Sequence, residues 1–428
     1  MSRFIRFPGI APAAIAIIHA VAVGAHASEP APPVGLKYTV PELVALAKSS
    51  SLLLGSQDLR IEEGRLAASQ ARAWPGLTVD LLTGRKRQSS EQGTRYDFGV
   101  TQPLPLAGKP RLRGRLLEIE TEASGARRSA SETALTLDVF QLAYEYAINR
   151  RKATFVEERR KRFGLIDSYL AGRVFASPQK KAESRIVQNR IISLAADVLQ
   201  IQGGFKASFE KLRVFVPLER GAYPEVEIAW FAGAKTLDDT DWIAKGLERN
   251  STVRLQRLAV QGAEVENSLA SRDAWPEPSI LARYEEVRTP DVEKTTGLGL
   301  SLALPSWNAN RAGIKSAAAK SESERRFLGF EERRLNAEIA QALVEYEAAR
   351  LTVAQYPQAL LADLEKQLQE ADAGFRKGQV DLLTFLELDG SAIEAFNRAF
   401  DAQLTLASKL AALWRLSGER DVTQLGSY

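Results

Sequence analysis

The sequence predicts a mainly α-helical fold that also carries four β-strands, arranged as two structural repeats. Three observations lead to this prediction: long proline-free runs with apolar residues at helical spacing, two regions in which apolar and polar residues alternate, and the recurrence of Ala-Trp-Pro at 73–75 and 274–276. Hydrophobic residues make up 45% and charged residues 26% of the 428-residue chain, which is typical of a folded protein.

The N-terminal residues have the three parts of an export signal. Arg3 and Arg6 give a positive start, "IAPAAIAIIHAVAV" is an apolar core, and "AHA" at 25–27 fits a small-x-small cleavage site. A membrane anchor is the alternative, but the apolar run is shorter than the roughly 20 residues of a spanning helix. The prediction is therefore a signal peptide at 1–27, cleaved before Ser28.

Composition excludes several classes of protein. The chain has no cysteine, both histidines (His19 and His26) lie in the signal, and Met1 is the only methionine. Zinc and soft-metal sites depend mainly on these side chains, and so do most nucleophilic triads. We therefore expect no catalytic residues, no metal site and no cofactor, and the protein is not expected to be an enzyme. The 57 Lys and Arg against 53 Asp and Glu are spread out, without a basic patch interleaved with aromatics, so nucleic acid is not an expected partner.

The two halves of the chain repeat one pattern. Residues 41–75 parallel residues 238–276, each with a short helix, a polar break and a second helix ending at Ala-Trp-Pro. Further along, Gly99, Pro105 and Arg111 recur 200 residues later as Gly299, Pro305 and Arg311. We interpret this as an internal duplication with a first repeat at 28–213, a linker at 214–240 and a second repeat at 241–428.

Each repeat contains an expected β-hairpin, at about 76–104 and at about 277–304. Apolar residues alternate with polar ones in all four strands, as in Leu77, Val79 and Leu81. The strands are each about ten residues long, which is enough to cross a bilayer when tilted. A soluble sandwich edge is the alternative, but two hairpins do not fold alone and nothing else in the chain supplies strands in number.

Long helices are expected after each hairpin. Residues 111–170 and 308–355 lack proline and carry apolar stripes, at Leu135, Val139, Leu142 and Tyr146 and at Ile339, Leu343 and Tyr346. About 60 residues would make roughly 90 Å of helix, which persists only through coiled-coil packing. Each run meets a glycine-containing break and then a second apolar helix, so the prediction is a helical hairpin in each half, with its turn far from the strands.

This order of features resembles the TolC family of outer-membrane efflux proteins over about residues 40–428. The stretch "VTQPLPLAGKPR" looks like the segment between second strand and long helix in the cobalt-zinc-cadmium, heavy-metal branch, and "AGFRKGQVDLLTFLELD" is similar to the second helical turn of the family. The resemblance implies a homotrimer in the outer membrane of a Gram-negative cell, with a 12-stranded barrel and a long periplasmic α-helical tunnel. Strand edges exposed to lipid are not tolerated, so closure by other copies is also expected on physical grounds, and twelve strands leave a water-filled lumen.

The function implied by the resemblance is a passive exit duct, joined to an inner-membrane pump of the RND type and a periplasmic adaptor. Heavy-metal cations as cargo rest on the branch resemblance alone, and drug efflux or type I secretion are alternatives. A periplasmic coiled-coil scaffold is a further alternative. It would explain the helices and the export signal but not the two hairpins with their apolar faces.

The resemblance also points to residues at the helical turns. Counted from Gly378, the family's constricting acids would fall near Thr384 and Glu387. Only Glu387 is acidic, and Asp381 lies one turn back. The hypothesis is that Glu387, with Asp381, forms a ring of negative charge that attracts cations and closes the resting tunnel; ordinary solvated acids are the alternative. The turn residues Gly172, Arg173, Gly378 and Gln379 would face the adaptor or pump, or would only reverse the chain.

The repeated Ala-Trp-Pro predicts where helix becomes strand. Proline is poorly tolerated inside a helix and favours extended geometry in the residue before it. Trp74-Pro75 and Trp275-Pro276 would then lie at the membrane–water boundary, which suits the amphipathic indole ring. Two ordinary core tryptophans beside helix-ending prolines are the alternative.

Overall fold

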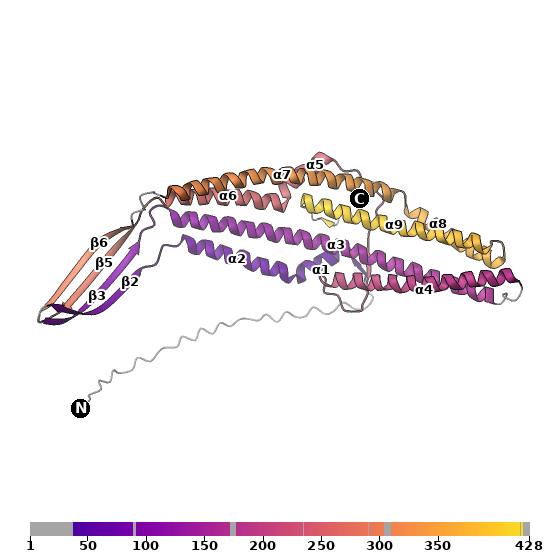
Figure 1. The fold of residues 1–428 in the computed structure, drawn as a ribbon, viewed down its shortest axis with the longest axis horizontal. Helices are drawn as coiled ribbons and strands as arrows, with labels where there is room; N and C mark the ends of the chain where they lie inside the picture. The colour runs from indigo at the N-terminus through magenta and orange to yellow at the C-terminus, as the bar shows by residue number, and fades with distance from the viewer. Residues whose placement is uncertain are drawn as a thin grey trace, which may run out of the picture.

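A four-stranded sheet stands at one end of a long layer of helices, and the turn at residues 378–381 lies at the other end (Figure 1). This computed structural model describes residues 37–88, 91–171, 177–233, 235–289, 291–303, 310–419 and 421–422. The expected signal peptide at 1–27 lies outside the described residues. A mainly helical chain with a few strands is confirmed.

The first half of the chain contributes α1 (Val40–Ser50), α2 (Leu52–Arg72), α3 (Lys109–Ala171) and α4 (Pro178–Arg213). The polar break expected between the two short helices is an N-cap, because the Ser51 hydroxyl accepts a hydrogen bond from the Leu54 N–H at 3.3 Å. Helix α3 has 63 residues, which makes it about 95 Å long. Helix α4 returns along it.

The second half contributes α5 (Asp239–Arg249), α6 (Ser251–Arg272), α7 (Arg311–Ala354), α8 (Gln358–Lys377) and α9 (Leu382–Ser417). Asn250 caps α6 by accepting from the Thr252 N–H at 2.8 Å. The long helix expected at 308–355 corresponds to α7, but a separate helix, α8, stands between it and the turn glycine. Pro357 causes this break because it has no N–H to donate and it disfavours helical geometry in the residue before it.

The two expected hairpins form one antiparallel sheet. Its strands are β2 (Thr78–Gln88), β3 (Glu91–Pro103), β5 (Glu277–Arg288) and β6 (Val292–Ala303), in the order β2-β3-β5-β6. Strand β3 pairs with β5 and so joins the halves of the chain, with Phe98 opposite Tyr284. In a small parallel pair formed by β1 (Lys37–Thr39) and β4 (Glu225–Glu227), β1 contacts α1 and β4 contacts α3.

The main core lies midway along the helical layer, where helices from both halves meet. Phe140, Tyr144 and Trp414 are fully buried there. The 214–240 segment is held against these helices: Gln403 exchanges two 2.9 Å hydrogen bonds with the backbone of Phe231, and the Tyr144 hydroxyl donates to the Ala229 carbonyl at 2.9 Å. The apolar stripes expected from the sequence contribute buried residues to this core: Leu135, Val139, Tyr146, Ile339, Leu343 and Tyr346.

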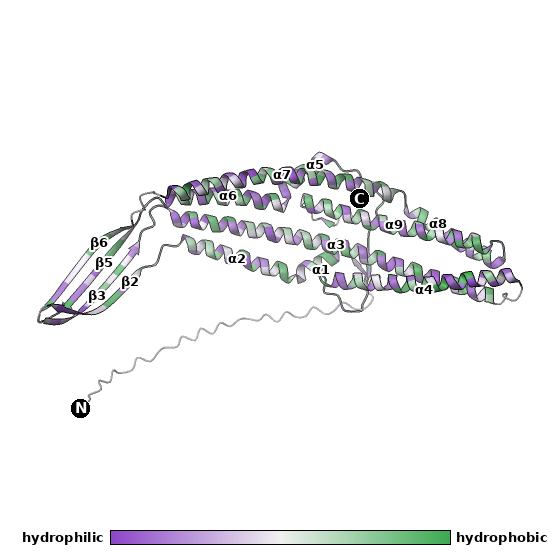
Figure 2. Ribbon diagram, viewed as in Figure 1, coloured by the Kyte–Doolittle hydropathy of each residue, from purple (hydrophilic) through white to green (hydrophobic). Residues whose placement is uncertain are grey.

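Hydrophobic and hydrophilic residues are mixed along the helices (Figure 2). None of the helices in the described ranges combines the length and the apolar character needed to cross a bilayer.

Candidate functional site

The two Trp-Pro pairs lie where helix gives way to strand. Trp74 and Pro75 stand between the end of α2 and the start of β2, and Trp275 and Pro276 stand between α6 and β5. The tryptophan side chains are 67% and 65% exposed, so neither is a core residue. The indole rings of Trp74 and Trp275 are therefore both exposed at the end of the sheet that is next to the helices.

Hydrogen bonds tie these junctions to neighbouring segments. The Gln102 amide at the end of β3 donates to the Pro75 carbonyl at 3.0 Å. The Asn310 amide, just before α7, donates to the Ala270 carbonyl of α6 at 3.1 Å. These contacts join the end of β3 to the α2–β2 junction and the start of α7 to α6.

Lys109 links the two halves at this level and was missed by sequence reasoning. It is the first residue of α3, its side chain is nearly buried, and its ammonium lies 3.4 Å from the Trp275 carbonyl oxygen. The same ammonium pairs with Asp273 at 3.4 Å and Glu277 at 3.2 Å. Nothing in the local sequence around Lys109 signals this contact, because its partners are more than 160 positions away.

The sheet has one apolar and one polar face. The strand register places Val79, Val100, Ala282 and Leu298 in one row and Leu81, Phe98 and Tyr284 in the next. Most of these side chains are substantially exposed, as are the neighbouring Ile280, Leu300 and Leu302. Exposed apolar surface of this extent marks a contact with lipid or protein.

The opposite face carries a network of ion pairs. The Arg283 guanidinium donates to Asp97 at 2.8 Å, and Arg95 lies 3.2 Å from the Asp97 carboxylate and 2.9 Å from that of Glu285. Two adjacent strands, β3 and β5, therefore carry these ion pairs on the face opposite the apolar residues, which we call the apolar belt (Val79, Leu81, Phe98, Val100, Ile280, Ala282, Tyr284, Leu298, Leu300 and Leu302). A sheet of this kind separates an apolar medium from a polar one.

At the far end of the helical layer, a glycine turn connects α8 and α9. Gly378 has φ +77°, a left-handed conformation that glycine adopts without strain. The Gln379 N–H donates to the Gly374 carbonyl at 2.9 Å and closes the turn. Gly378 and Gln379 are both exposed. The other predicted turn residues, Gly172 and Arg173, lie outside the described residues.

Asp381 and Thr384 form the N-cap of α9. The Asp381 carboxylate accepts from the Thr384 N–H and from the Thr384 hydroxyl, both at 2.9 Å. The first of these bonds, then the second, holds the pKa of Asp381 below its usual range. The cap therefore stabilises the fold above the ordinary carboxyl pKa and is lost as the pH falls through the lowered value. An Asp at this position before an apolar helix was a readable cap signal.

Glu387 lies further along α9 and is exposed. In the part of the chain that the structure describes, it forms no ion pair with another side chain. The structure thus brings Asp381 and Thr384 together, whereas Glu387 stands apart and is free to face a solvent-filled space.

A buried ion pair lies next to these residues. Arg159 of α3 and Asp389 of α9 are 4% and 1% exposed, and the guanidinium makes a bidentate contact in which Nε lies 3.1 and 2.9 Å from the two carboxylate oxygens. The guanidinium also lies over the Phe163 ring at 5.4 Å from its centroid. Sequence reasoning missed this pair as well.

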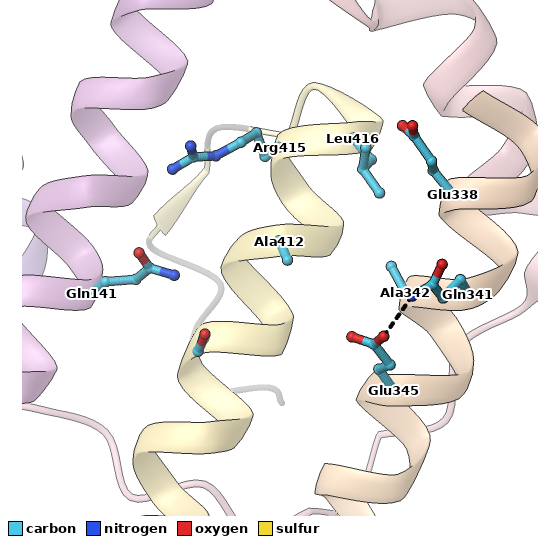
Figure 3. A pocket seen from close by; sticks show the side chains of 9 residues that line it. Gln141, Glu338, Gln341, Ala342, Glu345, Ala412, Arg415 and Leu416 are labelled. Atoms are coloured by element: carbon cyan, nitrogen blue, oxygen red, sulfur yellow. Dashed lines mark hydrogen bonds between the residues drawn. The ribbon is translucent and has the colours of Figure 1, made fainter. Parts of the chain in front are cut away.

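A shallow groove crosses the middle of the layer between α3, α7 and α9 (Figure 3). Its charges are paired within the chain: Glu345 accepts from Lys409 and Gln341 at 2.8 Å each, and Arg415 donates to Asp138 at 2.7 Å. Hydrogen bonds from Lys409 and Gln341 lower the pKa of Glu345. Across the described ranges, no cluster of three or more acidic side chains has metal-binding geometry.

The arrangement of sheet and helices was compared with known proteins. Neither a protein-family model nor a curated protein matches the sequence. A solved membrane protein from Pseudomonas aeruginosa is 17% identical and aligns over 88% of this chain and 92% of its own, with a TM-score of 0.73. The chain therefore shares the fold of this membrane protein.

Two outer membrane channels have the same fold. The CmeC outer membrane channel of Campylobacter jejuni is 13% identical over 89% of this chain and 86% of its own, with a TM-score of 0.72. The MtrE outer membrane channel of Neisseria gonorrhoeae, in its open state, is 17% identical over 89% of each chain, with a TM-score of 0.70. The channel fold expected from the sequence is confirmed, while the heavy-metal branch is not distinguished by these likenesses.

Proposed function

We propose that this protein is the outer-membrane duct of a tripartite efflux system, a passive conduit and not an enzyme. The observation that carries the proposal is the two-faced sheet, which has an apolar belt on one side and the paired charges of Asp97, Arg95 and Arg283 on the other. The sheet stands at the end of a helical layer about 95 Å long, estimated from α3. The export signal and the channel fold support the same proposal.

The cargo that we propose is heavy-metal cations, on the resemblance of "VTQPLPLAGKPR" to the heavy-metal branch. A duct should not bind its cargo tightly, because tight sites trap it. Metal selection would then belong to the pump.

The function is tested by deleting the gene and by reconstituting the purified protein in planar bilayers. We expect gated channels in the bilayer and a strain sensitive to cobalt, zinc and cadmium salts. Sensitivity to drugs alone would favour the drug-efflux alternative, and a secretion defect would favour type I secretion. A soluble periplasmic pool that forms no channels would favour the scaffold.

We propose that the working unit is a homotrimer. Strands β2 and β6 stand at the two edges of the sheet, and neither has a second strand partner among the described residues. Such edges are not tolerated in lipid, so they must pair with another copy. Two copies would give eight strands, an interior that side chains just fill, whereas three give twelve and leave a lumen.

The helical layer supports the same ring. Helices α2 and α7 form its two edges next to the sheet, on the sides of β2 and β6 respectively (Figure 1). Helix α2 carries Leu52, Leu59 and Leu66 at seven-residue spacing, each at least 63% exposed. Helix α7 carries the half-exposed stacked pair Phe327 and Phe330. We propose that the α7 edge of one copy packs on the α2 edge of the next, a head-to-tail contact that closes into a ring.

The proposed partners at the helical turns are a periplasmic adaptor and an inner-membrane pump of the RND type. Gly378 and Gln379 are exposed at the tip of the chain, where a docking partner has access. The chain has no cysteine, so a single engineered thiol reports without background. The same contact is proposed for Gly172 and Arg173.

A photocrosslinker on Gln379→Cys should capture the adaptor in cells. The matched control is Leu199→Cys, on exposed surface within α4 and away from the turns. Capture from the control position alone, or from neither position, would contradict docking at the tip.

We propose that Glu387 forms the ring of negative charge at the periplasmic aperture. Its exposure and its lack of an ion-pair partner within the described residues support this role. Asp381 is committed to the cap of α9, so its contribution to the ring is secondary, and Thr384 serves the same cap.

Glu387→Gln should reduce cation selectivity, which is measured as a shift of the single-channel reversal potential toward zero in a salt gradient. Asp381→Asn removes the charge but keeps an N-capping side chain, and we expect a smaller shift. Glu394→Gln is the control, because Glu394 is exposed and already pairs with Arg398. An unchanged reversal potential in Glu387→Gln would dispose of the aperture ring.

A further inference from the structure

At the end of the sheet away from the helices, the last three rows of the apolar face carry basic side chains. Beyond the Leu81 row, the register places Thr83, Tyr96, Glu286 and Lys294 side by side, then Arg85, Thr94, Arg288 and Val292, and then Arg87 and Gln92. Because these rows continue the alternation of the apolar rows, their side chains lie on the apolar face. This basic rim, Arg85, Arg87, Arg288 and Lys294, has four cations against the single carboxylate of Glu286.

The cations of the rim differ in how far they are neutralised. The Arg288 guanidinium donates to Glu286 at 2.5 Å and lies over the Tyr96 ring at 5.6 Å from its centroid. Glu286 also accepts from the Tyr284 hydroxyl at 2.7 Å and is nearly buried. Arg85 and Arg87 are exposed, and neither forms an ion pair with another described residue. Two guanidinium groups are therefore available to an anion.

The position of Arg85 and Arg87 along β2 corresponds to the level of the lipid headgroups. At roughly 3.4 Å per residue, Arg87 lies about 34 Å along the chain from Leu77, the residue before β2, which is about 26 Å across the membrane for a strand tilted by about 40° and close to the roughly 25 Å apolar band of such barrels. The exposed Trp74 marks the near boundary of the belt, so Arg85 and Arg87 stand at the far boundary. Arg85 and Arg87 are also about 7 Å apart along one strand.

Ring closure would concentrate the charge further. Arg85 and Arg87 are on edge strand β2, and Lys294 is on the opposite edge strand β6. In the proposed trimer these edges meet, so the Lys294 of one copy would join the rim of the next. Like charges brought together are costly unless an anion is shared between them.

We propose that this rim binds the phosphate groups of an anionic lipid in the outer leaflet. Guanidinium groups suit phosphate because they donate two parallel hydrogen bonds to it, and the apolar belt below the rim suits the acyl chains. Lipid binding at this site would hold the sheet at a defined depth in the membrane. The proposal rests on the proposed function, since it requires the sheet to cross the outer membrane.

The probe is lipid A with both phosphates, added to the detergent-solubilised full-length protein and followed by native mass spectrometry. Arg85→Gln combined with Arg87→Gln should weaken lipid retention about tenfold or more. The matched control is Lys86→Gln, which removes one charge from the same strand on its opposite face and should retain the lipid. Dephosphorylated lipid A should bind the unaltered protein as weakly as lipid A binds the double variant.

Several results would overturn the proposal. These are an equal loss in Lys86→Gln, no loss in the double variant, or inorganic phosphate binding as tightly as lipid A, which would indicate a site for free phosphate. The double variant should still form channels in planar bilayers, which shows that it folds. Failure of the unaltered protein to enter bilayers would refute the proposed function itself, a result distinct from failure of the lipid site.

Discussion

Asp389→Asn should destabilise the protein by about 3–5 kcal/mol, because it leaves the Arg159 guanidinium charged and unpaired in the interior. Both side chains are almost fully buried between α3 and α9, and the contact is bidentate. The stacked Phe163 ring cannot replace a carboxylate as a counter-charge. The measurement is the denaturant midpoint of helix unfolding, followed by circular dichroism in detergent.

The same pair of helices offers a matched control. Lys152 of α3 and Asp401 of α9 form an ion pair at 2.7 Å, but Asp401 is 65% exposed. Asp401→Asn should therefore cost less than about 1 kcal/mol. Replacing both buried partners, as Arg159→Met with Asp389→Leu, should recover most of the stability lost in Asp389→Asn, since no unpaired charge is left. Equal losses in Asp389→Asn and Asp401→Asn would show that burial does not set the value of the pair.

This ion pair also bears on the tip. Asp389 lies two positions after Glu387 on α9, and Arg159 fixes that part of α9 to α3. The proposed aperture residue is thereby carried on a helix that is held in one register. A change in selectivity in Glu387→Gln can therefore be assigned to the lost charge, because the position of α9 is held by the Arg159–Asp389 ion pair.

The sequence predicted those parts of the fold that depend on local signals. Absence of proline over 111–170 predicted α3, and Ala-Trp-Pro predicted both helix–strand junctions, because backbone restriction by proline acts on adjacent residues. Alternation of apolar residues predicted the strands and the shared apolar face. Pro357 carried the signal for the separate helix α8, although the prediction ended its helix two residues earlier without expecting another.

Contacts between distant residues could not be predicted in this way. Arg159 and Asp389 are 230 positions apart, and Lys109 and Trp275 are 166 apart. Each side chain taken alone resembles an ordinary solvated charge, and only the packing of one half against the other makes it buried. The pairing of β3 with β5 is of the same kind. For the candidate site, the turn glycine Gly378 was predictable, whereas the commitment of Asp381 to the helix cap was overlooked.

Leu59→Glu together with Leu66→Glu should prevent the trimer from assembling. A leucine buried at an interface contributes about 1.5–3 kcal/mol, and a closed ring uses each position three times. An unpaired carboxylate in the same contact adds a desolvation cost. The measurement is the mass of the detergent-solubilised protein by light scattering after size-exclusion chromatography. Leu165→Glu is the control: Leu165 is 57% exposed but lies on α3, inside the layer, so the trimer should persist.

A disulfide tests which helix edges meet. Measured from the sheet, Leu59 lies about 20 Å along α2 and Phe327 about 24 Å along α7. The two positions therefore lie at nearly the same level of the two helix edges that we propose to meet. A disulfide needs two Cα atoms about 5.5 Å apart. If the edges pack on each other, Leu59→Cys with Phe327→Cys should give covalently linked dimers and trimers on oxidation. The chain has no other cysteine, so either single variant should give no linked trimer. A double variant that is trimeric by mass but never crosslinks would place the contact between copies elsewhere than α2 and α7. If the unaltered protein has the mass of a monomer, the proposed trimeric ring is wrong.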